Sequence, residues 1–145
     1  YIDNRILNMP EIIITKPITM TMDVIEAEDY LSTLTVHLDI KIRHFTGFFQ
    51  YQADDLSFFC QKWDIFSHGL LNLGSIEDLS LKDLGEQFRI SIKRKASDTY
   101  LFTLFCYEPE LGEGATELTF SITVDSDDLS QMMNTFQAFP KWWTS

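Results

Sequence analysis

Two stretches of the chain contain the same four letters, DDLS. "ADDLSFFCQKWDIF" occupies residues 53–66, and "SDDLSQMMNTFQAF" occupies residues 126–139. In both, DDLS follows a strand-like run and leads into apolar residues at positions i, i+3, i+4, i+7 and i+10, the stripe of an amphipathic helix. These residues are Leu56, Phe59, Cys60, Trp63 and Phe66 in the first stretch, and Leu129, Met132, Met133, Phe136 and Phe139 in the second. The pattern predicts helices over residues 54–66 and 127–139.

The aspartates of DDLS have two possible roles. Aspartate at a helix start accepts hydrogen bonds from the N–H groups of the first turn, and its charge suits the positive end of the helix dipole. The alternative is a catalytic acid–base pair with one raised pKa, drawn from Asp54, Asp55, Asp125, Asp127 and Asp128. We favour capping, because it explains why the aspartates precede the apolar stripe. "DSDDLS" does not match a calcium loop, because Leu129 and Ser130 stand where a ligand and a glycine are required.

Alternation of apolar and polar residues predicts most of the remaining structure as strands. The alternating segments are "EIIITKPITMTMD" (residues 11–23, broken at Pro17), "LTVHLDIKIRH" (34–44), "FTGFFQYQ" (45–52), a short strand around Leu79 and Leu81, "QFRISIKR" (87–94), "TYLFTLFCY" (99–107) and "TELTFSITV" (116–124). "TYLFTLFCY" is apolar on both faces and is expected to be a central strand.

These elements predict an α+β fold. We expect one largely antiparallel, meander-like β-sheet with two α-helices packed on one face. We also expect a weak internal duplication, strands followed by a DDLS helix, twice. The apolar face of the sheet is expected to contain Leu34, Val36, Leu38, Phe88, Ile90, Leu118 and Phe120.

Length and composition indicate a single domain over residues 1–145. No apolar run approaches 18 residues, so no membrane span is expected. Cys60 and Cys106 fall on apolar faces, which predicts buried thiols and a cytoplasmic location.

The charge balance limits the classes of partner. The chain has 22 acidic and 11 basic residues, a formal net charge of −11. This excess argues against binding nucleic acid or an anionic membrane, and it favours attraction of a basic partner. Solubility alone is the competing explanation.

The sequence contains no recognisable catalytic or cofactor motif. His37, His44 and His68 are isolated, and neither they nor the cysteines have the spacing of a zinc site. We therefore expect no enzyme activity, no cofactor and no metal. Trp142 and Trp143 are expected to pack against a sheet edge, the alternative being an exposed anchor for a partner.

The segments "FTGFFQYQADDLSFFCQKW" and "LTFSITVDSDDLSQMMNTFQAFP", with the order of elements between them, resemble the WapI-type immunity proteins of bacterial toxin systems. The resemblance covers residues 34–140. It implies a protein that binds the C-terminal effector domain of a cognate toxin and blocks it. Toxins that attack nucleic acid are commonly basic, which suits an acidic inhibitor.

Two acidic stretches are the candidate partner-binding surface. Neither shows helix or strand periodicity, so we expect loops, where recognition is frequent. Their acids are Asp23, Glu26, Glu28 and Asp29 in "DVIEAEDY", and Glu108, Glu110, Glu113 and Glu117 in "YEPELGEGATE". Plain solvated loops are the alternative.

Two other functions remain open. The chain could be a small-ligand-binding protein or enzyme with a pocket between sheet and helices. It could also be a scaffold or assembly domain that uses exposed sheet edges.

Overall fold

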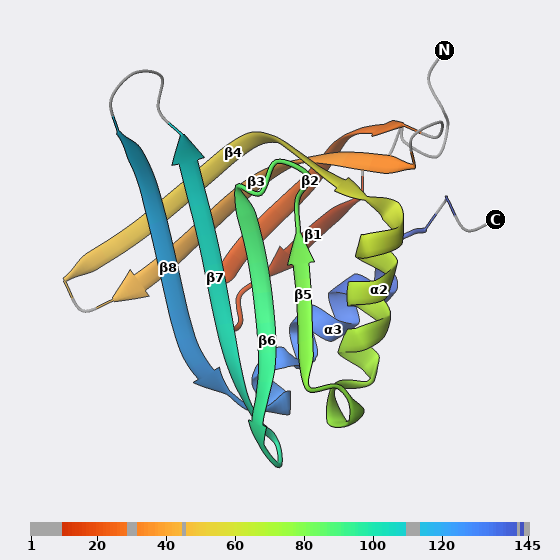
Figure 1. The fold of residues 1–145 in the computed structure, drawn as a ribbon, viewed down its shortest axis with the longest axis vertical. Helices are drawn as coiled ribbons and strands as arrows, with labels where there is room; N and C mark the ends of the chain where they lie inside the picture. Colours follow the sequence, from red (N-terminus) through yellow and green to blue (C-terminus); the bar gives the residue numbers. More distant parts are fainter. Residues whose placement is uncertain (1–9, 29–31, 45, 110–113, 142, 144–145) are drawn as a thin grey trace.

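The computed structural model describes residues 10–28, 32–44, 46–109, 114–141 and 143. These residues form two successive units, each with four strands followed by a helix (Figure 1). The first unit comprises β1 (Glu11–Ile14), β2 (Thr19–Glu28), β3 (Thr33–His44), β4 (Gly47–Phe59) and α2 (Cys60–Leu71). A short 3-10 helix, η1 (Leu73–Ser75), leads to the second unit, which comprises β5 (Asp78–Lys82), β6 (Phe88–Ala96), β7 (Thr99–Pro109), β8 (Ala115–Val124) and α3 (Ser126–Ala138).

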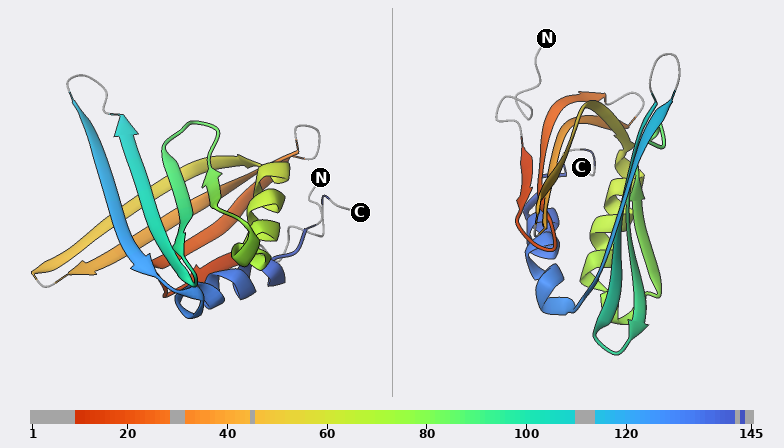
Figure 2. Two further views of the ribbon diagram at one scale, coloured as in Figure 1. Left: turned by 60° about the horizontal axis from the view of Figure 1, so that its bottom comes forward. Right: turned by 90° about the vertical axis from the view of Figure 1, so that its left-hand side faces the viewer.

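The strands form two antiparallel sheets. The first sheet has the order β1-β2-β3-β4, and the second has the order β5-β6-β7-β8. The sheets lie in two layers, and their strands cross at a steep angle (Figures 1 and 2). The α+β class and the antiparallel pairing agree with the sequence, and β7 is a central strand as expected. The single sheet is not confirmed, because α2 and η1 separate β4 from β5 and carry the chain into the second layer.

The hydrophobic core lies between the two sheets. Alternating residues of the strands point inward and belong to one buried cluster. Phe58 of β4 meets Phe88 of β6 edge to face, with ring centroids 6.1 Å apart, which joins the two layers directly. The expected apolar face is therefore divided between two facing sheets. Its members on β3 and β6 are buried, whereas Leu118 and Phe120 on β8 are only partly buried.

The sequence predicted that both helices would cover one face of a single sheet. The structure shows a different arrangement. Helix α2 packs against β5, and α3 packs against β1, so each helix covers an outer strand of the other unit. The helices also contact each other through Phe136 of α3, whose ring centroid lies 5.1 Å from that of Trp63 and 5.2 Å from that of Phe66. Both helices thus close the same side of the two-layer core.

The first DDLS is not a helix cap. Val36 pairs with Leu56, and Leu38 pairs with Ala53, so His37 alone stands opposite Asp54 and Asp55. Two residues opposite one is a β-bulge, which bends the strand and shifts its alternation. Helix α2 begins only at Cys60, without a side-chain cap. The backbone N–H of Cys60 instead donates to the carbonyl oxygen of Ser32 at 2.8 Å.

The predicted position of Phe59 in a buried helical stripe is wrong. It was expected in the first apolar stripe, but it is the last residue of β4 and pairs with Thr33. This position places its side chain on the outer face of the sheet, and the residue is 45% exposed. The buried stripe of α2 consists instead of Cys60, Trp63, Phe66, Ser67, Gly69 and Leu70.

The second DDLS does start a helix. Asp125 is the N-cap of α3, and its carboxylate accepts from the backbone N–H of Asp128 at 2.9 Å. The carboxylate of Asp128 in turn accepts from the N–H of Asp125 at 3.1 Å, which completes a capping box. The cap is therefore Asp125, and Asp127 lies in the first turn. Leu129, Met132, Phe136 and Phe139 are buried as predicted.

Cys60 and Cys106 are both buried, as expected. Among the described residues, no helix has the length and apolar content needed to cross a membrane.

Candidate functional site

The first acidic stretch is part of a strand, not a loop. Asp23, Glu26 and Glu28 all lie in β2, where the register shifts between Val24 and Glu26. This irregularity leaves the exposed Ile25 outside the regular pairing and breaks the alternation that would have predicted the strand. Glu26 and Glu28 are exposed, Asp23 is partly buried, and Asp29 lies outside the described residues.

The second acidic stretch was also expected to be a loop, but its described carboxylates lie in two paired strands. Glu108 lies near the end of β7 and Glu117 near the start of β8, and both side chains are exposed. Glu117 pairs with Tyr107, and Glu108 pairs with Thr116, so the two carboxylates belong to one end of the β7–β8 hairpin. Glu110 and Glu113 lie outside the described residues.

The structure does not bring the two acidic stretches together. Glu28 pairs with Thr33, which pairs with Phe59 immediately before α2. Helix α2 packs on β5, whereas Glu117 lies on β8 at the opposite edge of the second sheet. The corresponding strand ends lie at different corners of the molecule in Figures 1 and 2. A compact partner would therefore contact one stretch at a time.

Several carboxylates that could have been catalytic have structural partners. Asp125 and Asp128 form the capping box of α3. Asp83, which is buried, accepts from the backbone N–H groups of Gly85, Gln87 and Phe88 at 3.2, 2.8 and 2.9 Å. Asp83 is not among the residues predicted from the sequence, although the "KDLGEQF" turn that contains it has the aspartate and glycine typical of such a turn. Its three bonds organise the β5–β6 turn.

The outer face of the first sheet carries a row of titratable groups. Glu11, Asp23 and His37 occupy paired positions on β1, β2 and β3, and the Nδ1 atom of His37 lies 3.2 Å from Oδ1 of Asp54 on β4. A hydrogen bond with Asp23 raises the pKa of Glu11, with smaller contributions from desolvation and from the charge of Asp23. Within the described parts of the chain, no group of three or more His, Cys, Asp or Glu residues could hold a metal ion.

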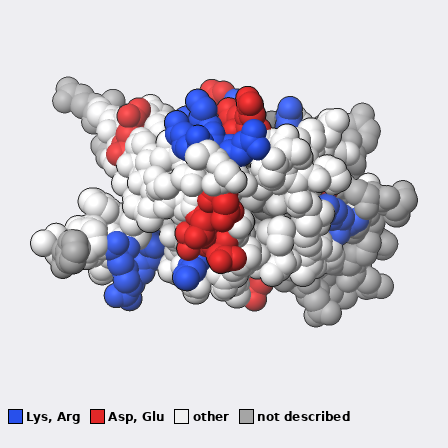
Figure 3. All heavy atoms as spheres, turned by 90° about the horizontal axis from the view of Figure 1, so that it is seen from below, with Lys and Arg blue, Asp and Glu red and all other residues white. Residues whose placement is uncertain are grey.

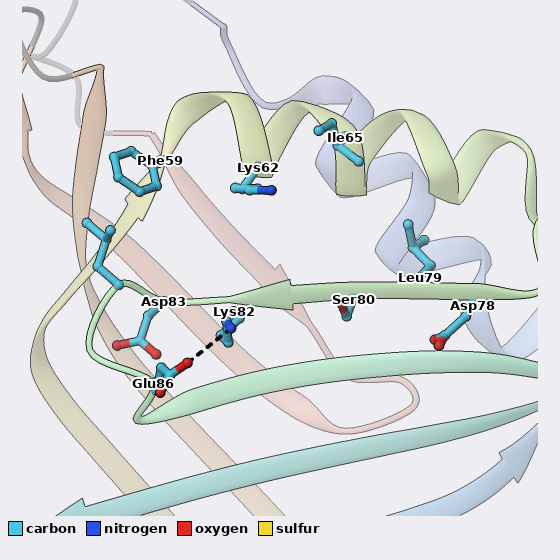
Figure 4. A pocket seen from close by; sticks show the side chains of 10 residues that line it. Phe59, Lys62, Ile65, Asp78, Leu79, Ser80, Lys82, Asp83 and Glu86 are labelled. Atoms are coloured by element: carbon cyan, nitrogen blue, oxygen red, sulfur yellow. Dashed lines mark hydrogen bonds and ion pairs between the residues drawn. The ribbon is translucent and has the colours of Figure 1, made fainter.

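A groove runs between α2 and β5 (Figure 4). It has a volume of about 570 Å³, and the apolar side chains of Phe59, Ile65 and Leu84 line it. All three are at least 45% exposed. Charged groups flank them, including Lys62, Asp78 and an ion pair between Lys82 and Glu86 at 3.1 Å. An apolar centre with a charged rim is typical of a binding surface for a protein or a small molecule.

The surface charge is uneven despite the acidic total. On the face that carries α3 and the β6–β7 turn, blue patches of Lys and Arg lie on either side of a red patch of Asp and Glu (Figure 3). Basic residues also project from the outer face of the second sheet, where Lys82 pairs with Arg89, and Arg89 lies over the ring of Phe105 at 5.5 Å.

The outer edge of the second sheet is uncovered. Strand β8 pairs with β7 on one side, and no described strand pairs with its other edge. The apolar residues Leu118 and Phe120 are partly buried, and Ile122 is 40% exposed. The alternating pattern predicted β8 as a strand, but it did not indicate that β8 lies at the edge of a sheet.

Trp143 packs against the core, and no exposed anchor is seen at this position. Its indole N–H donates to Oδ2 of Asp64 at 2.7 Å, and its ring centroid lies 6.2 Å from that of Phe139. These contacts join it to α2 and to the segment after α3. Trp142 lies outside the described residues.

Comparisons with known proteins identify no family. No family model matches the chain, and no curated protein matches it significantly. Among solved structures, the chain is similar to one chain from a structure described as a guide-RNA-binding protein complex bound to a guide RNA. The similarity covers 92% of this chain and 91% of that chain, with 10% identity and a TM-score of 0.47. At this distance the similarity carries no argument about function.

Proposed function

We propose that the chain is an immunity protein, which binds the C-terminal effector domain of a cognate bacterial toxin in the cytoplasm and blocks it without catalysis. The proposal starts from the resemblance of residues 34–140 to WapI-type immunity proteins. It requires a surface that recognises another protein and no catalytic group of its own. The partner is expected to be basic and can be a nuclease.

The observation that best supports this proposal is the arrangement of acids around β8. Glu108 and Glu117 project at one end of the strand, and the exposed Asp125 and Asp127 follow its other end. Between them, residues 118–124 carry no charge. Acids on the rim of an uncharged strip can steer a basic partner and set its orientation, while the strip itself supplies desolvated contact area.

The structural roles of several carboxylates support binding over catalysis. Asp83 is engaged by three backbone N–H groups, and Asp125 and Asp128 hold the start of α3. Each of these groups therefore has a structural reason to be present. We propose that the chain is not an enzyme and needs no cofactor.

Binding to a toxin effector domain encoded by a neighbouring gene would test the proposal directly. We expect a stoichiometric complex whose association rate falls steeply as ionic strength rises, because steering by exposed charges is screened by salt. Reversal of the pair Glu108 and Glu117 to lysine should slow association by about tenfold or more. The matched control reverses Glu26 and Glu28, at the other corner of the molecule, and should change the rate by less than about twofold. If reversal of either pair changes the association rate equally, Glu108 and Glu117 have no special role at the interface. If no complex forms, the proposed function is wrong.

The acidic total also predicts what the chain does not bind. We expect no retention on single-stranded RNA or on anionic vesicles at physiological salt, because phosphate binding requires clustered positive charge. Tight, salt-sensitive binding of either would contradict the proposal and would direct attention to Lys82, Arg89 and Phe105 on the second sheet.

A second candidate function is supported by the groove between α2 and β5. A volume of about 570 Å³ lies within the range of small-molecule sites. This reading makes the chain a small-ligand-binding protein. A native mass spectrum of the chain purified from its own host would distinguish the two functions, since a small co-purifying mass favours the ligand and a stoichiometric basic chain favours the inhibitor.

A further inference from the structure

Strand β8 lacks the features that normally protect a sheet edge. Natural outer strands are blunted by charges, proline, bulges or a covering element. Residues 118–124 contain neither charge nor proline, and β8 pairs with β7 over ten consecutive residue pairs without a register shift. The other outer strands are treated differently. Helices pack against β1 and β5, and β4 has the bulge with the exposed Asp54 and Asp55.

The inner face of β8 is apolar but incompletely covered. Leu118, Phe120 and Ile122 pair with Cys106, Leu104 and Phe102 of β7, which are all buried. In each of these three pairs the β7 residue is buried and its β8 partner is more exposed. Ile122 is 40% exposed.

The β3–β4 hairpin extends beyond this edge. Strand β4 crosses the inner face of the second sheet (Figure 1), because Phe58 contacts Phe88 of β6 and Tyr51 packs against the buried cluster between the sheets. Continuing the same way along β4, Phe49 comes next on the inner face, since it pairs with the inward-facing Ile42. Figure 1 and the left view of Figure 2 show the hairpin passing β8 and projecting outward. Phe49 is 54% exposed there.

The edge of β8 and the projecting hairpin thus form an open corner, defined by Phe49, Leu118, Phe120 and Ile122. The edge of β8 offers backbone groups to an added strand. The hairpin supplies an apolar surface beneath the place where that strand would lie. Helices fill the corner between the sheets on the other side of the molecule, whereas no described element of this chain pairs with β8 here.

We propose that an extended segment of the toxin domain pairs with β8 as a fifth strand of the second sheet and packs its inward side chains on Phe49. This inference rests on the proposed function and specifies its contact. The segment should have apolar residues at alternate positions facing Phe49, and polar ones beside Thr119, Ser121 and Thr123 on the outer face. Lysine or arginine at its ends would face Glu117 at one end of β8 and Asp125 at the other. Strand addition of this kind obtains affinity from backbone hydrogen bonds and specificity from alternate side chains.

A partner strand suits the corner better than a second copy of this chain. Two copies paired about a two-fold axis would bring both projecting hairpins beneath the same edge. Each copy also carries a net charge of −11, so the two would repel each other. A basic-ended strand meets neither obstacle.

Adjacent phenylalanines provide a matched pair of variants. Phe48 and Phe49 are 53% and 54% exposed, but Phe48 pairs with Arg43 on the outer face and lies under Lys41. We expect Phe49→Ala to weaken binding of the neighbouring-gene effector domain by about tenfold or more, the loss typical of a central interface aromatic. Phe48→Ala should change the dissociation constant by less than about threefold. Equal losses for the two variants would overturn the proposal.

A second pair of variants tests the strand edge. Ile122→Lys places a charge at the edge of β8, as natural edge strands do, and should weaken binding by about tenfold or more. Its control is Ile13→Lys on β1, where the native isoleucine is 51% exposed. Hydrogen exchange supplies a direct readout. Backbone amides within residues 118–123 should become protected when the effector domain binds.

The outcomes separate this contact from the function on which it rests. If the wild-type chain binds the effector domain, but Phe49→Ala and Ile122→Lys bind equally well and β8 gains no protection, the strand contact is wrong and the inhibitor function stands. If the wild-type chain forms no complex, the function fails and the contact fails with it. If sedimentation shows a dimer that Ile122→Lys dissociates, the edge belongs to a second copy and the proposal is overturned.

Discussion

The two units of this chain have the same order of elements but reach their helices in different ways. In the first, Asp54 and Asp55 form a bulge, β4 continues to Phe59, and a backbone carbonyl holds the first N–H of α2. In the second, β8 stops at Val124, and Asp125 caps α3 through its side chain. The same four letters, DDLS, therefore sit inside a strand in one unit and at a helix start in the other. What differs is the partner strand. His37 lies opposite the first pair of aspartates, whereas pairing of β7 with β8 ends at Val124, before the second pair.

The largest expected effect distinguishes the two predicted apolar stripes. Phe136→Ala should lower the free energy of unfolding by about 3–5 kcal/mol, because a fully buried ring between α2 and α3 is lost. Phe59→Ala should cost less than about 1 kcal/mol, since the ring lies on the surface. Urea unfolding of both variants makes the measurement. If Phe59→Ala lowered the free energy of unfolding as much as Phe136→Ala, Phe59 would have to be buried, as the sequence predicted.

The next effect concerns how closely α2 approaches the other unit. A methyl group at Gly69 would overlap the side chain of Leu79 on β5. We expect Gly69→Ala to destabilise the fold by about 1–2 kcal/mol, because overpacking outweighs the gain in helix propensity. Gly74→Ala is the matched control, since nothing lies within 4 Å of its added carbon. Thermal unfolding of the two variants should differ clearly, and a stabilised Gly69→Ala would show that α2 can move away from β5 at little cost.

A smaller effect tests the two DDLS joints directly. Asp125→Ala should cost about 1 kcal/mol, the usual loss for an N-cap. Asp54→Ala should change the free energy of unfolding by less than about 0.5 kcal/mol, since its contact with His37 lies on the surface. Chemical denaturation at neutral pH compares them. Equal losses at the two positions would contradict the assignment of one aspartate to a bulge and the other to a cap.

The smallest effect contrasts the outer faces of the sheets. On the outer face of the first sheet, Glu11 lies beside Asp23. On the outer face of the second sheet, the middle row of paired residues is uncharged and consists of Ser80, Ser91, Thr103 and Ser121. Because the folded state raises the pKa of Glu11 above its ordinary value of 4.5, the group stabilises the fold at low pH, and this contribution is lost as pH rises through the raised pKa. Glu11→Gln should flatten that part of the stability profile. Asp23→Asn should have the same effect, because it removes the cause of the shift, and a profile unchanged in both variants would contradict the pair.

Local patterns in the sequence predicted the strands and α3 well, because β3, β6, β7 and α3 each bury one regular face. Errors fell where a strand is irregular. The bulge at Asp54 and Asp55 shifts the alternation of β4, and the irregularity after Val24 hides the second half of β2. The division into two sheets could not be read from the sequence, since an inward-facing side chain looks the same whether a helix or another sheet covers it. For the same reason, the edge position of β8 depends on the whole fold.

The exchange of helices between the units has a consequence for fragments of the chain. Helix α3 covers β1 and also holds the β1–β2 turn, where Oε1 of Gln131 accepts from the N–H groups of Thr15 and Lys16 at 2.8 and 3.1 Å. Helix α2 performs the covering role for β5. A polypeptide ending at η1 would thus emerge from the ribosome with the buried stripe of α2 uncovered and with β1 lacking its helix. Two separately expressed halves, cut between Leu73 and Ser75, should each be poorly folded and should regain structure on mixing, as complementary fragments do. Folding of the intact chain should likewise be a single cooperative event that waits for the last helix to be synthesised.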